Sequence, residues 1–181
     1  SGKPDEFSPE VLFALMAGRA VDGTKLTNSK TDWRAPKELA FATHCEVSTG
    51  LQILGPHAMD HVLSRMDAVA MREIEAAWVR RQQDGVSTWQ PAQCLSLGAL
   101  HHRNRLGAPH GHGHRLLFLL AQCADGQWRT GDNARAIRDL SSRIRPALTA
   151  AMIDACADLG MHVTLHPGLA RDEGRYPSGA E

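Results

Sequence analysis

Five of the ten histidines lie between positions 101 and 114, and they carry the most specific chemistry in the sequence. His112 and His114 are separated by one residue. Alternate side chains of a β-strand lie on the same face, so these two imidazoles can bind one ion. His101 ends a preceding strand pattern, and a loop over residues 102–111 can bring its ring beside them. Three neutral imidazoles on one face predict a site for a divalent metal with open positions for a substrate.

Other assignments within this segment remain open. His110 has the same strand parity as His112 and is a competing ligand, whereas His102 points the other way if the strand continues. An H-x-H pair alone is a weak signal, and the glycines at 107, 111 and 113 also fit a flexible loop. The third histidine, on the neighbouring strand, is what favours a metal site.

The hydrophobic periodicity predicts the elements that must position these rings. Strand patterns cover Gln93–Leu100 and Arg115–Cys123, and Asp125-Gly126 is a turn signal leading into Gln127–Arg129. In the first half of the chain, the patterns predict a helix from Pro9 to Gly18, a helical or partly helical stretch from Pro36 through Leu39 and Val47 to near Gly50, and a long helix from Pro56 to Gly85. In the second half, they predict a helix capped by Asp132, a further helix from Pro146 to Gly160, and a strand over Met161–Leu165.

These patterns predict an α+β fold, a small and mainly antiparallel sheet with flanking helices. We expect one domain over residues 1–168 and a loose tail over 169–181, which is rich in Gly, Pro and charge. With 181 residues, 43% of them hydrophobic, the chain can bury a core.

The composition excludes several classes of protein. No stretch of 18 apolar residues could span a membrane, and the N-terminal residues do not resemble a signal peptide. The four cysteines are widely spaced and contain no C-x-x-C pair, which favours reduced thiols in a cytoplasmic protein. The formal net charge of zero argues at first against nucleic acid, but the arginines cluster around the histidine segment.

The histidine segment resembles the motif of MobF-type conjugative relaxases, the TraI and TrwC group of HUH endonucleases. That motif reads F-x-H-x-x-S-R-x-x-D-P-x-x-H-x-H. His101, Arg105, Pro109, His112 and His114 fall on its fixed positions without a gap. Asn104 replaces its Ser, Ala108 replaces its Asp, and Gly113 stands where a larger residue is usual. These departures leave the three histidines intact.

The resemblance extends over about residues 8–165, in the same order. The further matching elements are Leu15-Met16-Ala17-Gly18 with Asp22-Gly23-Thr24 for L-L-x-G…x-G-x-x, Ala35-Pro36-Lys37 for S-A-P-K-S, Met66-Asp67-Ala68-Val69 for A-H-D-x-A-V, and Asp125-Gly126-Gln127-Trp128-Arg129 for D-G-x-W-R.

The resemblance implies a relaxase/HUH-type, palm-like fold and a DNA-processing function in plasmid conjugation in the bacterial cytoplasm. Such enzymes nick one strand at an origin of transfer. The metal, Mg²⁺, Mn²⁺ or a transition metal such as Zn²⁺ or Ni²⁺, polarises the scissile phosphate. A tyrosine attacks it, leaving a 5′-phosphotyrosine and a free 3′-OH, so strand transfer is reversible. The implied partners are single-stranded and hairpin origin DNA, relaxosome accessory proteins and a fused or separate helicase.

Two departures concern catalysis. The family's tyrosine lies near its N-terminus, before the region that matches Ser1-Gly2, so we expect the first strand and the tyrosine-bearing helix to lie outside this chain. The sole tyrosine, Tyr176, is flanked by Gly and Pro in the tail and makes a poor nucleophile. The acidic residue of D-L-T-F-S-A-P-K aligns with Lys30, and Asp32, with the same strand parity, is the candidate acid.

Several side chains are candidates for contacting DNA or the reacting phosphate. Arg105 is a candidate catalytic residue because it lies on the motif. The candidate DNA contacts are Arg103, Arg115, Lys37 and Trp128. The basic run Arg135–Arg145 fits a phosphate-binding surface or a solvated helix face equally well.

Three functions are compatible with these observations. The first is a metal-dependent DNA nickase and strand transferase acting with a tyrosine from outside this chain, which alone is not expected to cleave by the tyrosine mechanism. The second is a catalytically inactive relaxase-like DNA-binding or accessory module. A three-histidine metallohydrolase unconnected with DNA is the third, and the collinear matches disfavour it.

Overall fold

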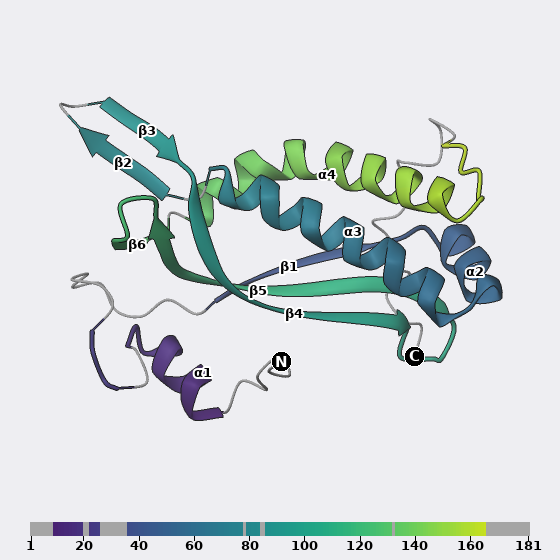
Figure 1. Cartoon of the computed structure of the whole chain (residues 1–181), viewed down its shortest axis with the longest axis horizontal. Helices are drawn as coiled ribbons and strands as arrows, with labels where there is room; N and C mark the ends of the chain where they lie inside the picture. The colour runs from purple at the N-terminus through teal and green to yellow at the C-terminus, as the bar shows by residue number, and fades with distance from the viewer. Residues whose placement is uncertain are drawn as a thin grey trace, which may run out of the picture.

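The computed structural model describes residues 9–19, 22–25, 36–77, 79–83, 86–131 and 133–165, and it has the α+β architecture that the sequence predicts (Figure 1). Helices and strands follow one another along the chain as α1 (Pro9–Met16), β1 (Lys37–Ala42), α2 (Cys45–Leu54), α3 (Pro56–Glu75), β2 (Val79–Gln83), β3 (Val86–Gln90), β4 (Ala92–Arg103), β5 (Pro109–Cys123), β6 (Trp128–Thr130) and α4 (Asn133–Asp158).

The long strand β5 is the centre of the sheet. It pairs antiparallel with β4 along one edge, and with β1 and then β6 along the other. The β4–β5 hairpin is closed by residues 104–108, a shorter loop than the one expected over 102–111. Strands β2 and β3 form a separate two-stranded ribbon that extends beyond the end of the sheet in Figure 1.

The main core lies between one face of this sheet and the helices α3 and α4. Helix α3 packs on β4 and β5, and α4 packs along α3. The apolar stripe predicted for α3 is buried at Met59, Val62, Leu63, Met66, Ala70 and Ile74. Each fully buried side chain of this size stabilises the fold by about 1.5–3 kcal/mol, so the α3 interface holds the sheet in place.

Helix α3 ends at Glu75, about ten residues before the end that the sequence predicts at Gly85. Residues 79–83 pair instead with residues 86–90, and Gln83 lies opposite Val86. The residues between the two strands are Asp84-Gly85, one of the strongest sequence signals for a tight hairpin. That signal outweighs the helical periodicity. Trp78 lies outside the described residues.

The stretch from Pro36 to Gly50 is also different from its prediction. Residues 37–42 form strand β1, and helix α2 begins at Cys45 and continues through Gly50 to Leu54. The strand wins because Leu39 and Phe41, two residues apart, face the core when β1 pairs with β5.

Two predictions at the C-terminal end are wrong. Pro146 lies inside the continuous helix α4 rather than between two helices. It is exposed, while Ile144 and Leu148 stay buried against the core, so packing offsets the hydrogen bond that a proline removes. Met161–Leu165 has no regular structure, although Met161 and Val163 still pack on the core.

The described cysteines are all free, as the sequence suggests. Cys94, Cys123 and Cys156 are buried and Cys45 is exposed. Burial raises the pKa of the Cys94 thiol to about 12, so it stays protonated. Among the described residues, no helix is long and apolar enough to cross a membrane.

Candidate metal centre

The histidine cluster lies at the closed end of the β4–β5 hairpin. His101 on β4 is directly opposite His112 on β5, and His114 follows two residues later. Three imidazoles from two neighbouring strands therefore share one face of the sheet. The ring centroids are 5.0 Å apart for His101 and His112, 5.0 Å for His112 and His114, and 5.4 Å for His101 and His114.

These separations suit a shared metal ion. A metal about 2.1 Å from each ligating nitrogen lies about 3.3 Å from each ring centroid, so ligands at tetrahedral angles have centroids about 5.3 Å apart. As the side chains stand, the described residues contain no group of three His, Cys, Asp or Glu that could hold a metal ion. The centroid separations are close to those of a tetrahedral site, and binding a metal would require the ring nitrogens to turn toward a common point.

Hydrogen bonds fix which nitrogen of two rings can bind metal. Nδ1 of His112 lies 2.9 Å from the carbonyl oxygen of His110, and Nδ1 of His114 lies 2.5 Å from Oε1 of Glu38. Both partners are acceptors, so each Nδ1 carries the proton and donates it. Nε2 is then the nitrogen with a lone pair for a metal. In metal sites, a ligating histidine usually donates its other ring N–H to a carboxylate or a backbone carbonyl in this way.

Glu38 is a candidate site residue that the sequence interpretation missed. It lies on β1, next in register to the pair Ala40–His114, and contacts the histidine from the neighbouring strand. A signal was present: with Glu38 on the acid, Glu38-Leu39-Ala40-Phe41-Ala42 fits the first five letters of D-L-T-F-S-A-P-K. This alignment excludes the match of Ala35-Pro36-Lys37 to the last letters of the same element. The residue chosen from the sequence, Asp32, lies outside the described residues.

The neighbouring histidines have other positions. The ring of His110 is 5.0 Å from that of His112, and its carbonyl oxygen holds His112 Nδ1. His102 points to the opposite face, as the parity rule predicts, where its Nε2 is 2.7 Å from Oδ1 of Asp60 on α3. On α3, Nε2 of His61 is 3.5 Å from Oδ2 of Asp158 on α4.

The reverse face of β5 packs tightly against β1 and the helices. A Cβ atom added to Gly113 would lie 2.3 Å from Cζ of Phe41, and one added to Gly111 would lie 2.4 Å from Sδ of Met59. The glycines between the histidines therefore permit close packing. The ring of Phe41 occupies the space that the larger residue usual at position 113 would need.

A buried polar cluster fixes the start of β5. The hydroxyls of Thr43 and Ser48 are 2.6 Å apart, and Gly111 N–H donates to Ser48 Oγ at 3.0 Å. Thr43 N–H in turn donates to the carbonyl oxygen of Gly111 at 2.8 Å. Both side chains are buried. The backbone between His110 and His112 is thus held by α2 and the residue after β1.

Asn104 and Ala108, the two residues of the hairpin loop that depart from the relaxase motif, are joined by a hydrogen bond. Oδ1 of Asn104 accepts hydrogen bonds from the backbone N–H groups of Leu106 and Ala108, at 2.9 and 3.0 Å. Gly107 has φ of 82°, a conformation that favours glycine. Arg103 donates to the carbonyl oxygen of Gly107 at 2.8 Å, and Arg105 is exposed in the same loop.

The other residues predicted to contact DNA lie on β1, β5, β6 and α4. Lys37 is exposed at the start of β1, opposite Leu117, and Trp128 is half-buried on β6, opposite Gln122. The side chain of Arg115 is directed to α3, where it pairs with Asp67. Of the basic run, Arg143 pairs with Glu73 at 3.1 Å. Tyr176 lies outside the described residues.

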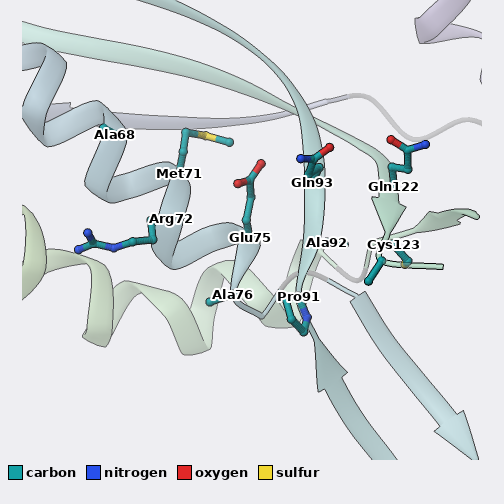
Figure 2. Close-up of a pocket in the computed structure, with 11 residues that line it drawn as sticks. Ala68, Met71, Arg72, Glu75, Ala76, Pro91, Ala92, Gln93, Gln122 and Cys123 are labelled. Atoms are coloured by element: carbon teal, nitrogen blue, oxygen red, sulfur yellow. The ribbon is translucent and has the colours of Figure 1, made fainter. Parts of the chain in front are cut away.

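A pocket of about 680 Å³ lies away from the histidines, between the C-terminal end of α3 and the far ends of β4 and β5 (Figure 2). Its polar lining includes Glu75, Gln93 and Gln122. Oε1 of Glu75 accepts a hydrogen bond from the backbone N–H of Cys94 at 3.1 Å, so this carboxylate holds the edge of β4.

Solved structures with the same fold are conjugative relaxases. A copper-bound structure of the conjugative relaxase TrwC with oriT DNA superposes with a TM-score of 0.73 and 19% identity, over 93% of this chain and 58% of that chain. A metal-bound TrwC–oriT complex gives 0.70 and 19%, over 85% and 55%. TrwC with a 27-mer DNA comprising the recognition hairpin and the cleavage site gives 0.69 and 18%, over 92% and 60%.

The chain thus spans a little more than half the length of these relaxase chains. The comparison with curated proteins gave no match. The TrwC relaxase family model matches residues 2–175, nearly the whole sequence. Together with the common fold, this match shows that the chain belongs to the TrwC relaxase family.

Proposed function

We propose that this chain forms the metal-binding part of a conjugative relaxase, which nicks one DNA strand at an origin of transfer and transfers it. The observation that carries the proposal is the histidine face of the β4–β5 hairpin, with two of its three rings held through Nδ1. The function belongs in the bacterial cytoplasm, with relaxosome proteins and a fused or separate helicase as partners.

The ligands would be the side chains of His101, His112 and His114, with Nε2 ligating in the latter two. An all-imidazole set suits Zn²⁺, Cu²⁺ or Ni²⁺ better than Mn²⁺ or Mg²⁺, which prefer oxygen ligands, and TrwC itself has been solved with copper. When bound, the metal would polarise the scissile phosphate and stabilise charge on its non-bridging oxygens. Glu38 would keep His114 in the ligating tautomer and orientation throughout.

DNA binding is supported by the distribution of basic and amide side chains. Arg103 and Arg105 lie in the hairpin that carries His101, where they would meet the phosphates next to the metal. The β2–β3 ribbon contains Arg80, Arg81, Gln82 and Gln83, and a two-stranded ribbon fits the major groove of a DNA hairpin. Lys37 and Trp128 remain proposed contacts for the single strand.

The nucleophile would be a tyrosine supplied from outside this chain. Attack of its oxygen on phosphorus would form a 5′-phosphotyrosine and break the bond to the 3′ oxygen, which leaves as a free 3′-OH. Asp32 and Glu38 are the proposed acidic groups near this step. A relaxase-like module that binds DNA without cutting it is the second candidate, because the only tyrosine here is Tyr176.

The test is cleavage of single-stranded and hairpin origin oligonucleotides by the gene product that contains this chain and its flanking segments. We expect nicking with Mn²⁺ or Mg²⁺ and a covalent protein–DNA product, both lost in His112→Ala/His114→Ala. Binding of the oligonucleotides without nicking under any metal would establish the non-cutting module instead. Calorimetry on the same pair of proteins measures metal uptake, and equal uptake by both would remove the proposed site.

A further inference from the structure

Arg115 immediately follows the ligand candidate His114 and is directed to the other side of the sheet. Its Nε donates to Oδ1 of Asp67 on α3 at 2.7 Å, and its Nη2 donates to Oδ2 of the same carboxylate. Its Nη1 donates to Oγ of Ser96 on β4 at 3.2 Å. One guanidinium thus ties together α3, β4 and the strand that carries two histidines.

The ion pair between Arg115 and Asp67 is largely shielded from solvent. The side chains of Arg115 and Asp67 are only 22% and 15% exposed. The hydrogen bonds to Asp67 raise the pKa of Arg115, and burial opposes them only in part. A bidentate pair with so little exposure holds its geometry more strictly than a surface pair, and losing one partner leaves a poorly solvated charge.

The backbone opposite Arg115 leaves room for its side chain. Gly98 lies directly across from Arg115 in the register. A Cβ atom at Gly98 would lie 2.7 Å from Cζ and Nε of the guanidinium, and 3.1 Å from Cδ. A side chain at 98 would therefore displace the arginine from Asp67. The glycine and the arginine form one arrangement, which crosses β4 to reach the helix.

The histidines are sensitive to the position of the backbone at Arg115. Neighbouring residues of a strand share a peptide unit and project to opposite faces, so a displacement of the β5 backbone at Arg115 would carry His114 with it. A metal site tolerates misplacement of its ligands by only about 0.5 Å. Glu38 restrains the ring of His114 from the front, while Asp67 restrains its backbone from behind.

We infer that Asp67 and Arg115 are positioning residues for the metal site, setting the placement of His112 and His114 from the reverse face of β5. This inference rests on the proposed function, because it presupposes that the histidines bind metal. It gives a physical role to Asp67 of the element Met66-Asp67-Ala68-Val69. It also assigns Arg115 a role other than contact with DNA, because its guanidinium already has three hydrogen bonds.

The chain supplies a matched control. Arg129 and Asp125 form a second bidentate pair, at 2.8 and 2.6 Å, in the turn between β5 and β6. This pair lies at the other end of β5 from the histidines and is more exposed, with 28% of the Arg129 side chain and 47% of the Asp125 side chain accessible. Asp125→Asn therefore removes a carboxylate from a similar ion pair away from the proposed site.

The experiment titrates the whole chain with Co²⁺, following calorimetry and the visible spectrum of the bound ion. The variants are Asp67→Asn, Arg115→Lys, Arg115→Gln and Asp125→Asn, each checked as folded by circular dichroism at the titration temperature. We expect Asp67→Asn and Arg115→Gln to weaken Co²⁺ binding about tenfold and to change its spectrum. Asp67→Asn/Arg115→Gln should be no weaker than either single variant, because the two residues act as one unit.

Arg115→Lys covers the case in which the other variants do not fold. It keeps the charge near Asp67 but loses the fork geometry, so we expect a folded protein with an altered Co²⁺ spectrum. A purely structural pair would lower the thermal midpoint and leave affinity and spectrum unchanged in every folded variant, and that result overturns the inference. An equal change in Asp125→Asn overturns it too. If the unmodified chain binds no Co²⁺, the proposed metal site fails first, and the inference fails with it.

Discussion

The two faces of strand β5 have different structural roles. One face presents His110, His112 and His114, of which the latter two hold fixed tautomers and partial exposure. The other face presents Gly111, Gly113, Arg115 and Leu117, packed against Phe41, α2 and α3. Adjacent residues, about 3.3 Å apart along the strand, therefore contribute either to the candidate metal site or to packing against the core.

This difference teaches how a site on a sheet can remain accessible and still be rigid. The polar rings need space for a metal and a phosphate, so they cannot be fixed by burial. The strand that carries these rings can be fixed by burial, because its other face contains small residues that let the core pack closely against it. The comparison predicts that substitutions on the first face change metal binding and that those at the glycines of the second face change stability. Arg115 is the residue of the second face expected to affect both.

The largest effect is expected from His112→Ala. Two imidazoles remain, and two protein ligands rarely hold a divalent ion, so we expect no measurable metal uptake by calorimetry. The free energy of unfolding should change by about 0.5 kcal/mol or less, since the ring is half-buried and its partner is a carbonyl oxygen. A large loss of stability would show that the histidine face also belongs to the core.

Gly113→Ala tests the reverse face. The new Cβ would lie 2.3 Å from Cζ of Phe41, so the buried ring must move or the strands must separate. We expect a loss of about 1–3 kcal/mol in the free energy of unfolding, measured in urea. Adding Phe41→Leu should recover part of it by making room. If Gly113→Ala has wild-type stability, the close packing of this face does not constrain the strand.

Ser48→Ala removes the hydroxyl that accepts from Gly111 N–H and contacts Thr43 Oγ1. The buried N–H would lose its partner, which costs about 1–2 kcal/mol in unfolding free energy. Thr49→Ala is the matched control, because its hydroxyl donates to the carbonyl oxygen of Cys45 at an exposed position. Equal losses in the two variants would contradict a special role for the buried cluster.

The histidine face could be predicted from the sequence because its cause is local. Period-two alternation in one strand, a short loop and one partner strand suffice to bring His101, His112 and His114 together. The resemblance added the elements around Asp67 and Asp125, without the contacts that they make. Helix α3 was predicted too long because Asp84-Gly85, a strong hairpin signal, follows a run that still has helical spacing.

The supporting residues could not be found in the same way. Asp67 and Arg115 are 48 residues apart, and Glu38 and His114 are 76 apart. No local period relates such pairs; the packing of β1 and α3 on β5 does. The error over residues 36–50 had a direct consequence, since a helix there would not have placed Glu38 beside the histidine strand.

Glu38→Gln has the smallest expected effect and separates the two faces most sharply. The amide can still accept through oxygen, but it carries no charge to orient the imidazole or to raise its basicity, so we expect metal binding to weaken about tenfold. Stability should stay within about 0.5 kcal/mol because the Glu38 side chain is 54% exposed. Glu38→Asp, which keeps the charge on a shorter side chain, should retain more of the affinity than Glu38→Gln. If both variants bind metal as the unmodified chain does, the carboxylate is not part of the site, and the orientation of His114 must come from the reverse face alone.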